Sequence, residues 1–163
     1  MKKLIIITGS MGVGKSHTCK ELNKRLLNSV WLDGDWCMMI NPLNFTAENT
    51  KMFLDNSVYL LKNFLSNITL DYVVYSWVFP REDILNYIIK QVNDTSFEMK
   101  KISLICSNEK LKERMRTAGR DIYTIEKSLL YQDAIRLMDT IKIDTTELKE
   151  DETIEEVLKI IKD

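Results

Sequence analysis

The sequence predicts an α/β fold in which helices cover both faces of a parallel sheet. Predicted strands and helices alternate along the 163 residues. The predicted strands are continuously apolar, as in LIIIT at 4–8 and YVVYSWVF at 72–79, and this pattern is typical of strands buried on both faces. Such sheets bind ligands at the carboxyl ends of their strands, so functional residues are expected directly after the strands.

Hydrophobic patterns and turn residues predict the individual elements. Five apolar runs, several rich in β-branched residues, are predicted to be strands at 3–8, 29–32, 72–79, 101–106 and 140–143. Six segments are predicted to be helices at 16–27, 46–65, 80–92, 108–118, 124–138 and 153–161. Thr46 can cap the second helix, Pro80 suits the start of the third, and Gly119 suits the C′ position of the fourth. Residues 41–45 are expected to form a loop. The whole chain, 1–163, is predicted to be a single domain.

A glycine-rich segment, GSMGVGKS at 9–16, follows the first predicted strand and precedes the first predicted helix. It fits G-x-x-x-x-G-K-[ST] at every fixed position, and the strand and helix are the context that this motif requires. Its backbone N–H groups and the helix N-terminus would hold a phosphate chain. Lys15 would contact the β- and γ-phosphates, and the Ser16 hydroxyl would bind Mg²⁺. The predicted nucleotide-binding residues here are Gly9, Ser10, Met11, Gly12, Val13, Gly14, Lys15, Ser16 and His17.

Two carboxylates follow the second predicted strand, in the segment WLDGDW at 31–36. The third predicted strand has no acidic residue at its end, where proteins with this phosphate-binding motif normally keep an acid for magnesium. Asp33 is therefore the candidate metal ligand, together with Ser16. Asp35 is the candidate base that accepts the proton of a substrate hydroxyl during phosphoryl transfer. The alternative is an ordinary Asp-Gly turn without a catalytic role.

The chain resembles the small P-loop kinases. The resemblance rests on GSMGVGKS, on LDGD at 32–35 and on LKER at 111–114. This group includes shikimate, gluconate, adenylylsulfate and nucleoside monophosphate kinases and antibiotic-resistance phosphotransferases. The resemblance implies a five-stranded parallel sheet in the order 2-3-1-4-5, ATP as phosphate donor, Asp33 near magnesium and Asp35 near the acceptor. The segments WCMM after Asp35 and SWVFPR at 76–81 differ from the adenylylsulfate and shikimate kinase patterns, so those two acceptors are not expected.

The resemblance also assigns roles to residues in the second half of the chain. It implies that Arg114 covers the adenine or the phosphates and contributes to catalysis, and that a short lid at about 115–127 carries Arg120. Guanidinium groups there would neutralise charge on the transferred phosphoryl group. It implies too that Thr145, after the fifth predicted strand, lies at the edge of the adenine. The alternative for the arginines is a solvated helix face.

The acceptor is expected to bind a flap at about 36–65. Its candidate ligands are Asp35, Trp36, Trp77 and Arg81, although core packing and surface exposure remain alternatives for the tryptophans and the arginine. Residues 36–80 contain only two cations, Lys51 and Lys62. A neutral hydroxylated acceptor such as a sugar, nucleoside or antibiotic is therefore favoured over a nucleoside monophosphate.

Composition limits the other possible functions. The formal net charge is −1, so nothing indicates binding to nucleic acid or to an anionic membrane. The three cysteines are far apart and form no zinc-binding pattern, which together with the lack of a signal peptide predicts a cytoplasmic protein, monomeric or homodimeric. The sequence predicts an ATP- and Mg²⁺-dependent phosphotransferase acting on a small-molecule or nucleotide acceptor. The alternatives are a polynucleotide 5′-hydroxyl kinase and a non-catalytic ATP-binding or resistance module.

Overall fold

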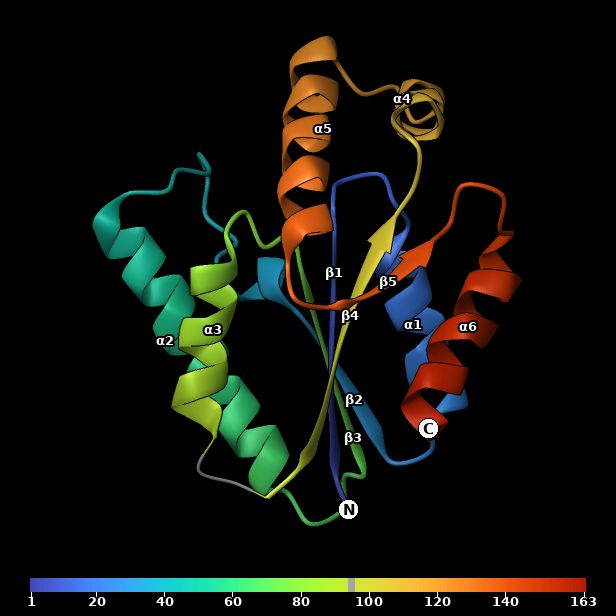
Figure 1. Ribbon diagram of the computed structural model, residues 1–163. Coiled ribbons are helices and arrows are strands. Elements are labelled where there is room, and N and C mark those ends of the chain that lie inside the picture. The colour runs from blue at the N-terminus through green and yellow to red at the C-terminus, as the bar shows by residue number, and fades with distance from the viewer. Residues whose placement is uncertain (94–95) are drawn as a thin grey trace.

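The chain forms one five-stranded, all-parallel sheet in the order β2-β3-β1-β4-β5 (Figure 1). The computed structural model describes residues 1–93 and 96–163. The strands are β1 (Lys3–Gly9), β2 (Ser29–Asp33), β3 (Tyr72–Trp77), β4 (Glu98–Ile105) and β5 (Ile141–Asp144). The predicted fold class and strand order are confirmed.

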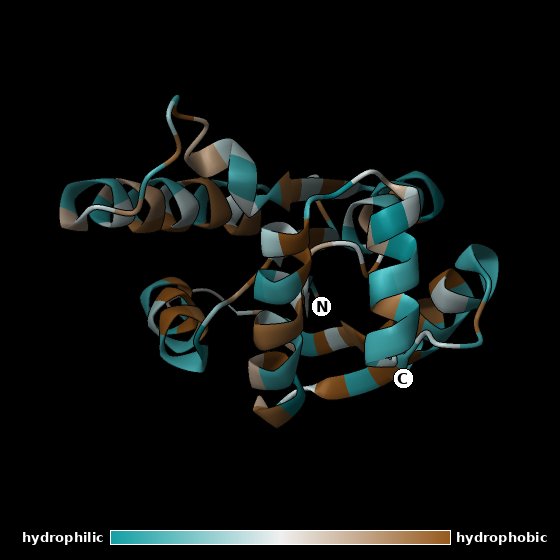
Figure 2. Cartoon of the chain, turned by 90° about the horizontal axis from the view of Figure 1, so that it is seen from above, coloured by the Kyte–Doolittle hydropathy of each residue, from teal (hydrophilic) through white to brown (hydrophobic). Residues whose placement is uncertain are grey.

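Helices lie on both sides of this sheet and above its carboxyl ends (Figure 1). They are α1 (Lys15–Arg25), α2 (Ala47–Ser66), α3 (Glu82–Val92), α4 (Asn108–Thr117), α5 (Ile122–Leu137) and α6 (Glu150–Lys162). In Figure 1, α2 and α3 lie on one side of the sheet and α1 and α6 on the other, while α4 and α5 rise above the carboxyl end of β4. Seen from above, the helices carry both hydrophilic and hydrophobic residues along their length (Figure 2).

The core consists of two clusters, one on each face of the sheet. In β1, Ile5 and Ile7 belong to the cluster that also contains residues of α1 and α6. Leu4 and Ile6 point the other way, into the cluster formed with α2 and α3. Successive side chains of a strand face opposite sides of a sheet, so a strand covered on both faces needs an apolar residue at every position. This explains the uninterrupted apolar run before the glycine-rich loop.

Two helix signals identified in the sequence have the expected geometry. The Thr46 side chain accepts a hydrogen bond from the backbone N–H of Asn49 at 3.1 Å and caps α2. Gly119 has a φ of 69° after the end of α4, and the backbone N–H of Arg120 donates to the Met115 carbonyl at 3.0 Å. This left-handed glycine ends α4 and turns the chain toward α5.

Several predicted boundaries are corrected. The third strand ends at Trp77 rather than at residue 79, and the next helix begins at Glu82 rather than at Pro80 because Arg81 occupies the N-cap with an extended backbone. The fourth strand begins at Glu98 rather than at residue 101, because its first N–H pairs with the Lys2 carbonyl beside β1. The last two helices begin two and three residues earlier than predicted, at Ile122 and Glu150.

A short 3-10 helix, η1 (Gly34–Cys37), was not predicted and follows β2 directly. The Asp33 side chain caps it by accepting a hydrogen bond from the backbone N–H of Asp35 at 3.1 Å. A Cβ atom on Gly34 would lie 2.6 Å from Cγ of Trp77, so only glycine lets η1 pack this closely on β3. The turn thereby fixes both carboxylates beside the end of the third strand.

The three cysteines are free and buried. Over residues 1–93 and 96–163, no helix is both long and apolar enough to span a membrane.

Candidate active site at the carboxyl ends of the strands

The glycine-rich loop at 9–16 has the backbone geometry of an anion-binding loop. Gly12 and Gly14 have φ values of 82° and 106°, in the left-handed region that side chains disfavour. A Cβ on Gly14 would meet nothing within 4 Å, so its backbone conformation, and not crowding, requires glycine there. Gly14 caps α1 without a side chain, which leaves the positive end of the helix open to the loop.

Lys15 lies folded against this loop, where its Nζ donates a hydrogen bond to the Ser10 carbonyl at 2.9 Å. Burial lowers the pKa of Lys15 from 10.5 to about 8, although the neighbouring Cys19, Asp33 and Asp35 oppose the shift. Within the described residues, the buried hydroxyl of Ser10 has no hydrogen-bond partner. A shielded cation and an unpaired hydroxyl in one loop fit a site for a phosphate chain.

The first carboxylate, Asp33, is half-buried next to Lys15 and Ser16. Burial raises its pKa above the usual value, while the backbone N–H of Asp35, the charge of Lys15 and the Ser16 hydroxyl oppose this shift. A hydroxyl and a carboxylate are oxygen ligands of the kind that Mg²⁺ prefers. The described residues contain no group of three or more metal-ligating side chains. Ser16 and Asp33 are the candidate ligands, since Mg²⁺ in phosphate sites takes one or two protein oxygens while phosphates and water complete its shell.

The second carboxylate, Asp35, is exposed and is held by a tryptophan. Its Oδ1 accepts a hydrogen bond from Nε1 of Trp77 at 3.0 Å. Asp35 lines a pocket of about 440 Å³ together with Lys15, Ser16 and Asp33. Arg120, from the short segment between α4 and α5, lines the same pocket. The structure thus brings the phosphate loop, both acids and one predicted lid arginine together. We call this space the phosphate pocket.

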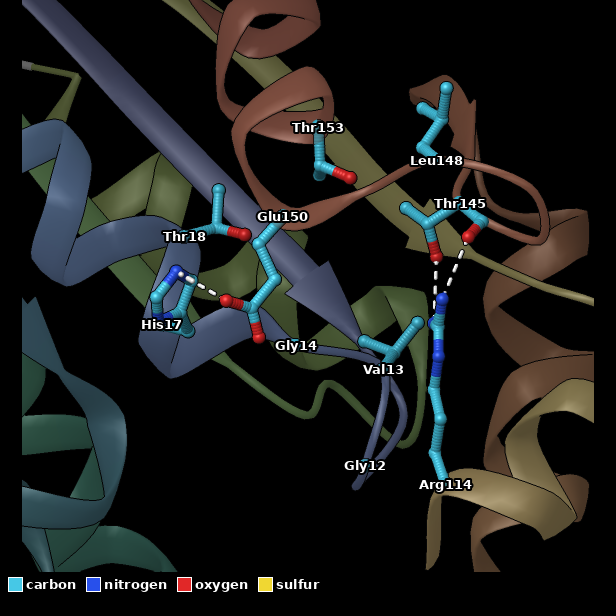
Figure 3. Close-up of a pocket in the computed structure, with 10 residues that line it drawn as sticks. All are labelled: Gly12, Val13, Gly14, His17, Thr18, Arg114, Thr145, Leu148, Glu150 and Thr153. Carbon is cyan, nitrogen blue, oxygen red and sulfur yellow. Dashed lines mark hydrogen bonds and ion pairs between the residues drawn. The ribbon is translucent and has the colours of Figure 1, made fainter.

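A neighbouring pocket of about 290 Å³ lies between the phosphate loop, α4 and the connection from β5 to α6 (Figure 3). Arg114 crosses it and donates two hydrogen bonds to Thr145, to Oγ1 at 3.1 Å and to the backbone carbonyl at 2.8 Å. His17 faces Glu150, with 3.3 Å between Nε2 and Oε2. Gly12, Val13 and Gly14 connect this pocket to the phosphate loop. Its position fits the base and ribose of a nucleotide.

Two further cavities, of about 410 and 360 Å³, adjoin Asp35 on the side of α2 and α3. Both are lined by Asp35, Leu43, Phe45, Phe53 and Trp77. The rings of Phe53 and Trp77 stack with centroids 4.1 Å apart and an angle of 33°. We call these two adjoining spaces the apolar cavity. Asp35 and Trp77 also line the phosphate pocket, so the two spaces meet at these residues.

Comparison with known proteins assigns the family. Residues 5–139 match the AAA domain family. The chain belongs to the AAA domain family. No curated protein matches the sequence of this AAA domain.

Solved structures of other proteins share the fold of this AAA domain. The tunicamycin resistance protein of Deinococcus radiodurans has a TM-score of 0.74 and 17% identity, over 99% of this chain and 96% of that protein. A gluconokinase from Sinorhizobium meliloti 1021 has a TM-score of 0.72 and 16% identity, over 98% and 91% of the two chains. The shikimate kinase of Aquifex aeolicus vf5 has a TM-score of 0.64 and 19% identity, over 98% and 96%. The fold is therefore that of the small P-loop kinases.

Three residues predicted for catalysis or acceptor binding in this AAA domain lie apart from the phosphate pocket. Arg114 lines the pocket on the Thr145 side and is not among the residues around Lys15 and the acids. Trp36 is exposed and packs on Trp31, with ring centroids 5.0 Å apart. Arg81 is exposed and pairs with Asp83. Neither Trp36 nor Arg81 lines the four cavities described above.

The helix α5 of the AAA domain contributes contacts that the sequence did not reveal. The Ser128 hydroxyl donates a hydrogen bond to the Met11 carbonyl in the phosphate loop at 2.6 Å. Gln132, fully buried, accepts from the backbone N–H of Cys106 at 3.1 Å. Lys127 and Tyr131 line the apolar cavity. The sequence does not reveal such contacts, because a polar residue that makes them cannot be distinguished from a polar residue on the solvent-facing side of a helix.

Proposed function

We propose that this AAA domain is an ATP-dependent phosphotransferase that moves the γ-phosphate to a hydroxyl group of a small molecule. The observation that carries the proposal is the position of Asp35. This carboxylate lines the phosphate pocket together with Lys15 and also lines the apolar cavity. A base at the junction of a donor site and a second cavity is the arrangement that transfer to an acceptor requires, because both substrates must meet at the reacting atoms.

Each residue has a defined task in this proposal. The loop amides and Lys15 bind the phosphates, and Arg114 and Thr145 border the nucleotide base. Bound Mg²⁺, held by Ser16 and Asp33, would supply neutralisation of phosphate charge. Arg120 belongs to the lid at 115–127 and would neutralise charge that develops on the transferred group.

The transfer itself requires one proton acceptor. Asp35 accepts the proton as the O–H bond of the acceptor breaks and a bond forms from that oxygen to the γ-phosphorus. The bond between the γ-phosphorus and the oxygen that bridges it to the β-phosphorus breaks, and ADP leaves. This step needs no oxidant or further reactant.

The fold relatives support a small acceptor. Two of them are a gluconokinase and a shikimate kinase, and a third is a tunicamycin resistance protein. We infer for this chain a small-molecule or nucleotide acceptor that binds beside the flap at 36–65. Buried, free cysteines suit a reducing compartment, so we place the enzyme in the cytoplasm.

The proposal predicts that Asp35→Asn abolishes transfer while nucleotide binding persists. Asparagine retains the oxygen that accepts the Trp77 hydrogen bond but cannot take up a proton, so transfer should fall by about 10²- to 10⁴-fold. The measurement follows label from γ-labelled ATP with Mg²⁺ across a panel of sugars, nucleosides, nucleotides, antibiotics and 5′-hydroxyl oligonucleotides.

The matched control is Asp83→Asn, because Asp83 is an exposed carboxylate whose partner is Arg81 and should not matter for transfer. Label that moves to an oligonucleotide would favour the polynucleotide kinase alternative. Tight ATP binding without transfer, with Asp35→Asn hydrolysing ATP like the wild type, would identify a non-catalytic binding module and reject the proposal.

A further inference from the structure

The apolar cavity is continuous with the reacting end of the phosphate pocket. Trp77 and Asp35 form part of the wall of both. An acceptor whose hydroxyl reaches Asp35 therefore places the rest of its body against the rings of Trp77, Phe53 and Phe45. The chemistry of this wall determines which acceptors can bind.

Most side chains of that wall are apolar. Aromatic rings come from three parts of the chain: Phe45 before α2, Phe53 within α2 and Tyr131 in α5. Trp77 contacts two rings, Phe53 at 4.1 Å and Phe79 at 5.4 Å between centroids, so its indole is fixed in place. Side chains of this kind bind a ligand through its apolar surface.

The rim of the cavity leaves large apolar side chains in water. Leu43 is 61% exposed and Phe45 is 55% exposed, and Met39 nearby is 80% exposed. All three line the cavity. Apolar side chains clustered at the mouth of a cavity are typical of a ligand site, since isolated domains seldom expose such groups together.

The lining of the cavity disfavours two acceptor classes, anionic compounds and polyols. Within the described lining, Lys127 is the only cation, and its Nζ lies 5.6 Å from the ring centroid of Tyr131. A phosphate or carboxylate on the acceptor would meet the Asp35 carboxylate with a single lysine to offset it. A polyol would bury several hydroxyls against apolar side chains, where burying a polar group without a hydrogen-bond partner is unfavourable.

We propose that the acceptor is an uncharged amphiphilic alcohol, in which one hydroxylated end reaches Asp35 and an aromatic or other large apolar group fills the apolar cavity. This inference rests on the proposed function, because it names the substrate class of the same site. The proton and phosphoryl group move as described above, and the product is the phosphate ester of that alcohol with ADP.

The test compares three compounds that share one diol and differ in a single substituent. They are glycerol, phenoxypropanediol, in which a phenyl ether replaces one terminal hydroxyl, and glycerol phosphate. Binding is measured with Mg²⁺ and a non-hydrolysable ATP analogue, through quenching of tryptophan fluorescence and by calorimetry. Transfer of label from γ-labelled ATP is measured separately. Phenoxypropanediol should bind at least tenfold more tightly than glycerol, and glycerol phosphate should bind no better than glycerol.

Two variants establish where the phenyl group binds. Phe45→Ala removes an exposed ring of the cavity and should lower the affinity for phenoxypropanediol about tenfold. The affinities for glycerol and for the ATP analogue should stay unchanged. The matched control is Tyr59→Ala, which removes a ring that is 68% exposed on α2 and that is not part of the cavity lining. It should leave all affinities unchanged.

The outcomes separate this inference from the proposed function. If phenoxypropanediol binds no better than glycerol, or if Phe45→Ala has no effect on it, the inference is wrong. Transfer to glycerol phosphate or to sugars in preference to phenoxypropanediol also overturns it, while the kinase function stands. If phenoxypropanediol binds as expected but no acceptor in either panel receives label, the ligand class holds and the proposed function fails.

Discussion

At the scale of single residues, the hydrogen bond from Trp77 to Asp35 is the contact on which the proposed chemistry depends most. The indole Nε1 lies 3.0 Å from Oδ1 of Asp35, and the ring itself leaves no space for a Cβ on Gly34. Asp35 is exposed, so this bond is what orients its carboxylate. A second tryptophan, Trp31, makes a comparable bond to the Ser76 hydroxyl at 2.9 Å and provides a matched comparison.

Replacing the indole should therefore slow transfer. Trp77→Phe keeps an aromatic ring in the wall but removes the donor to a charged group, a bond worth about 1.5–3 kcal/mol. We expect kcat to fall roughly tenfold or more, with the KM for ATP unchanged, in steady-state assays. Trp31→Phe should lose no activity. Equal losses in the two variants would mean that the effect is structural and that Trp77 does not position the base.

The buried charge of Lys15 should appear in the pH dependence of stability. Its pKa is about 8 in the folded protein and 10.5 when unperturbed. Between these values the unfolded chain binds more protons than the folded one, so folding becomes more favourable as pH rises. Without nucleotide, Lys15→Met should be more stable than the wild type at pH 7, and the difference should shrink as pH rises through 8 toward 10.5. Denaturant unfolding at several pH values gives the free energy of unfolding of both proteins. A difference between them that stays constant with pH would contradict the lowered pKa of Lys15.

At the scale of elements, α5 is the helix that ties the site together. Ser128 holds the phosphate loop through the Met11 carbonyl, and Gln132 holds the end of β4 through the backbone of Cys106. Arg136 donates to the carbonyl of the same residue at 2.6 Å. Side chains of α5 thus hold the phosphate loop and the carboxyl end of β4 from above the sheet.

Removing the first of these bonds should loosen the loop. Ser128→Ala leaves the Met11 carbonyl without this partner, and such a loss costs about 1–3 kcal/mol when the group is buried. We expect a lower free energy of unfolding and a severalfold weaker affinity for ATP, measured by denaturant titration and calorimetry. Ser66→Ala, at the exposed end of α2, is the control. Unchanged nucleotide affinity in Ser128→Ala would show that the loop holds its shape without α5.

The sequence predicts those elements whose pattern lies within a few consecutive residues. The apolar run of β1, the cap at Thr46 and the turn at Gly119 each depend on a few neighbouring residues, and each is confirmed. The phosphate loop is predictable for the same reason, since strand, glycines and helix are consecutive. The 3-10 helix after β2 was missed because its packing depends on Trp77, which lies about forty residues further along the chain.

Contacts between distant side chains account for the remaining differences in the site. Arg114, for which the resemblance implies a place over the adenine or the phosphates, reaches Thr145 because β5 lies next to β4. Ser128 contacts Met11 across 117 positions. Sequence reasoning assigned Asp35 and Trp77 to the acceptor and Arg120 to the lid, and the structure places all three around one pocket. The exposed positions of Trp36 and Arg81 became clear only from the folded structure.

At the scale of the whole molecule, the strand order places two cavities on opposite sides of the phosphate loop. β1 is central, with β4 and β5 on one side and β3 and β2 on the other. The pocket beside Arg114 lies toward β5 and α6, and the apolar cavity lies toward β3 and α2. Under the proposed function, donor and acceptor therefore approach the same loop from two directions.

Nucleotide binding should stabilise the entire fold. At a concentration one hundred times its Kd, a ligand adds about 2.7 kcal/mol to the free energy of unfolding, and for a chain of this length that corresponds to roughly 5–10 °C in Tm. Thermal unfolding with ATP and Mg²⁺ should show this increase. The Lys15→Ala variant should lose most of this increase in Tm at the same ATP concentration. A rise of equal size in Lys15→Ala would place the nucleotide elsewhere.

The shared position of α5 has a consequence for how each substrate affects the affinity for the other. This helix holds the donor loop through Ser128 and lines the acceptor cavity through Lys127 and Tyr131. We therefore expect a nucleotide that orders the loop to order this helix as well, and with it part of the wall of the acceptor cavity. Linkage requires the converse with the same factor, so the acceptor must tighten the nucleotide equally. We expect positive cooperativity between these two unlike ligands, so that a ternary complex forms more readily than the affinities of the two binary complexes suggest.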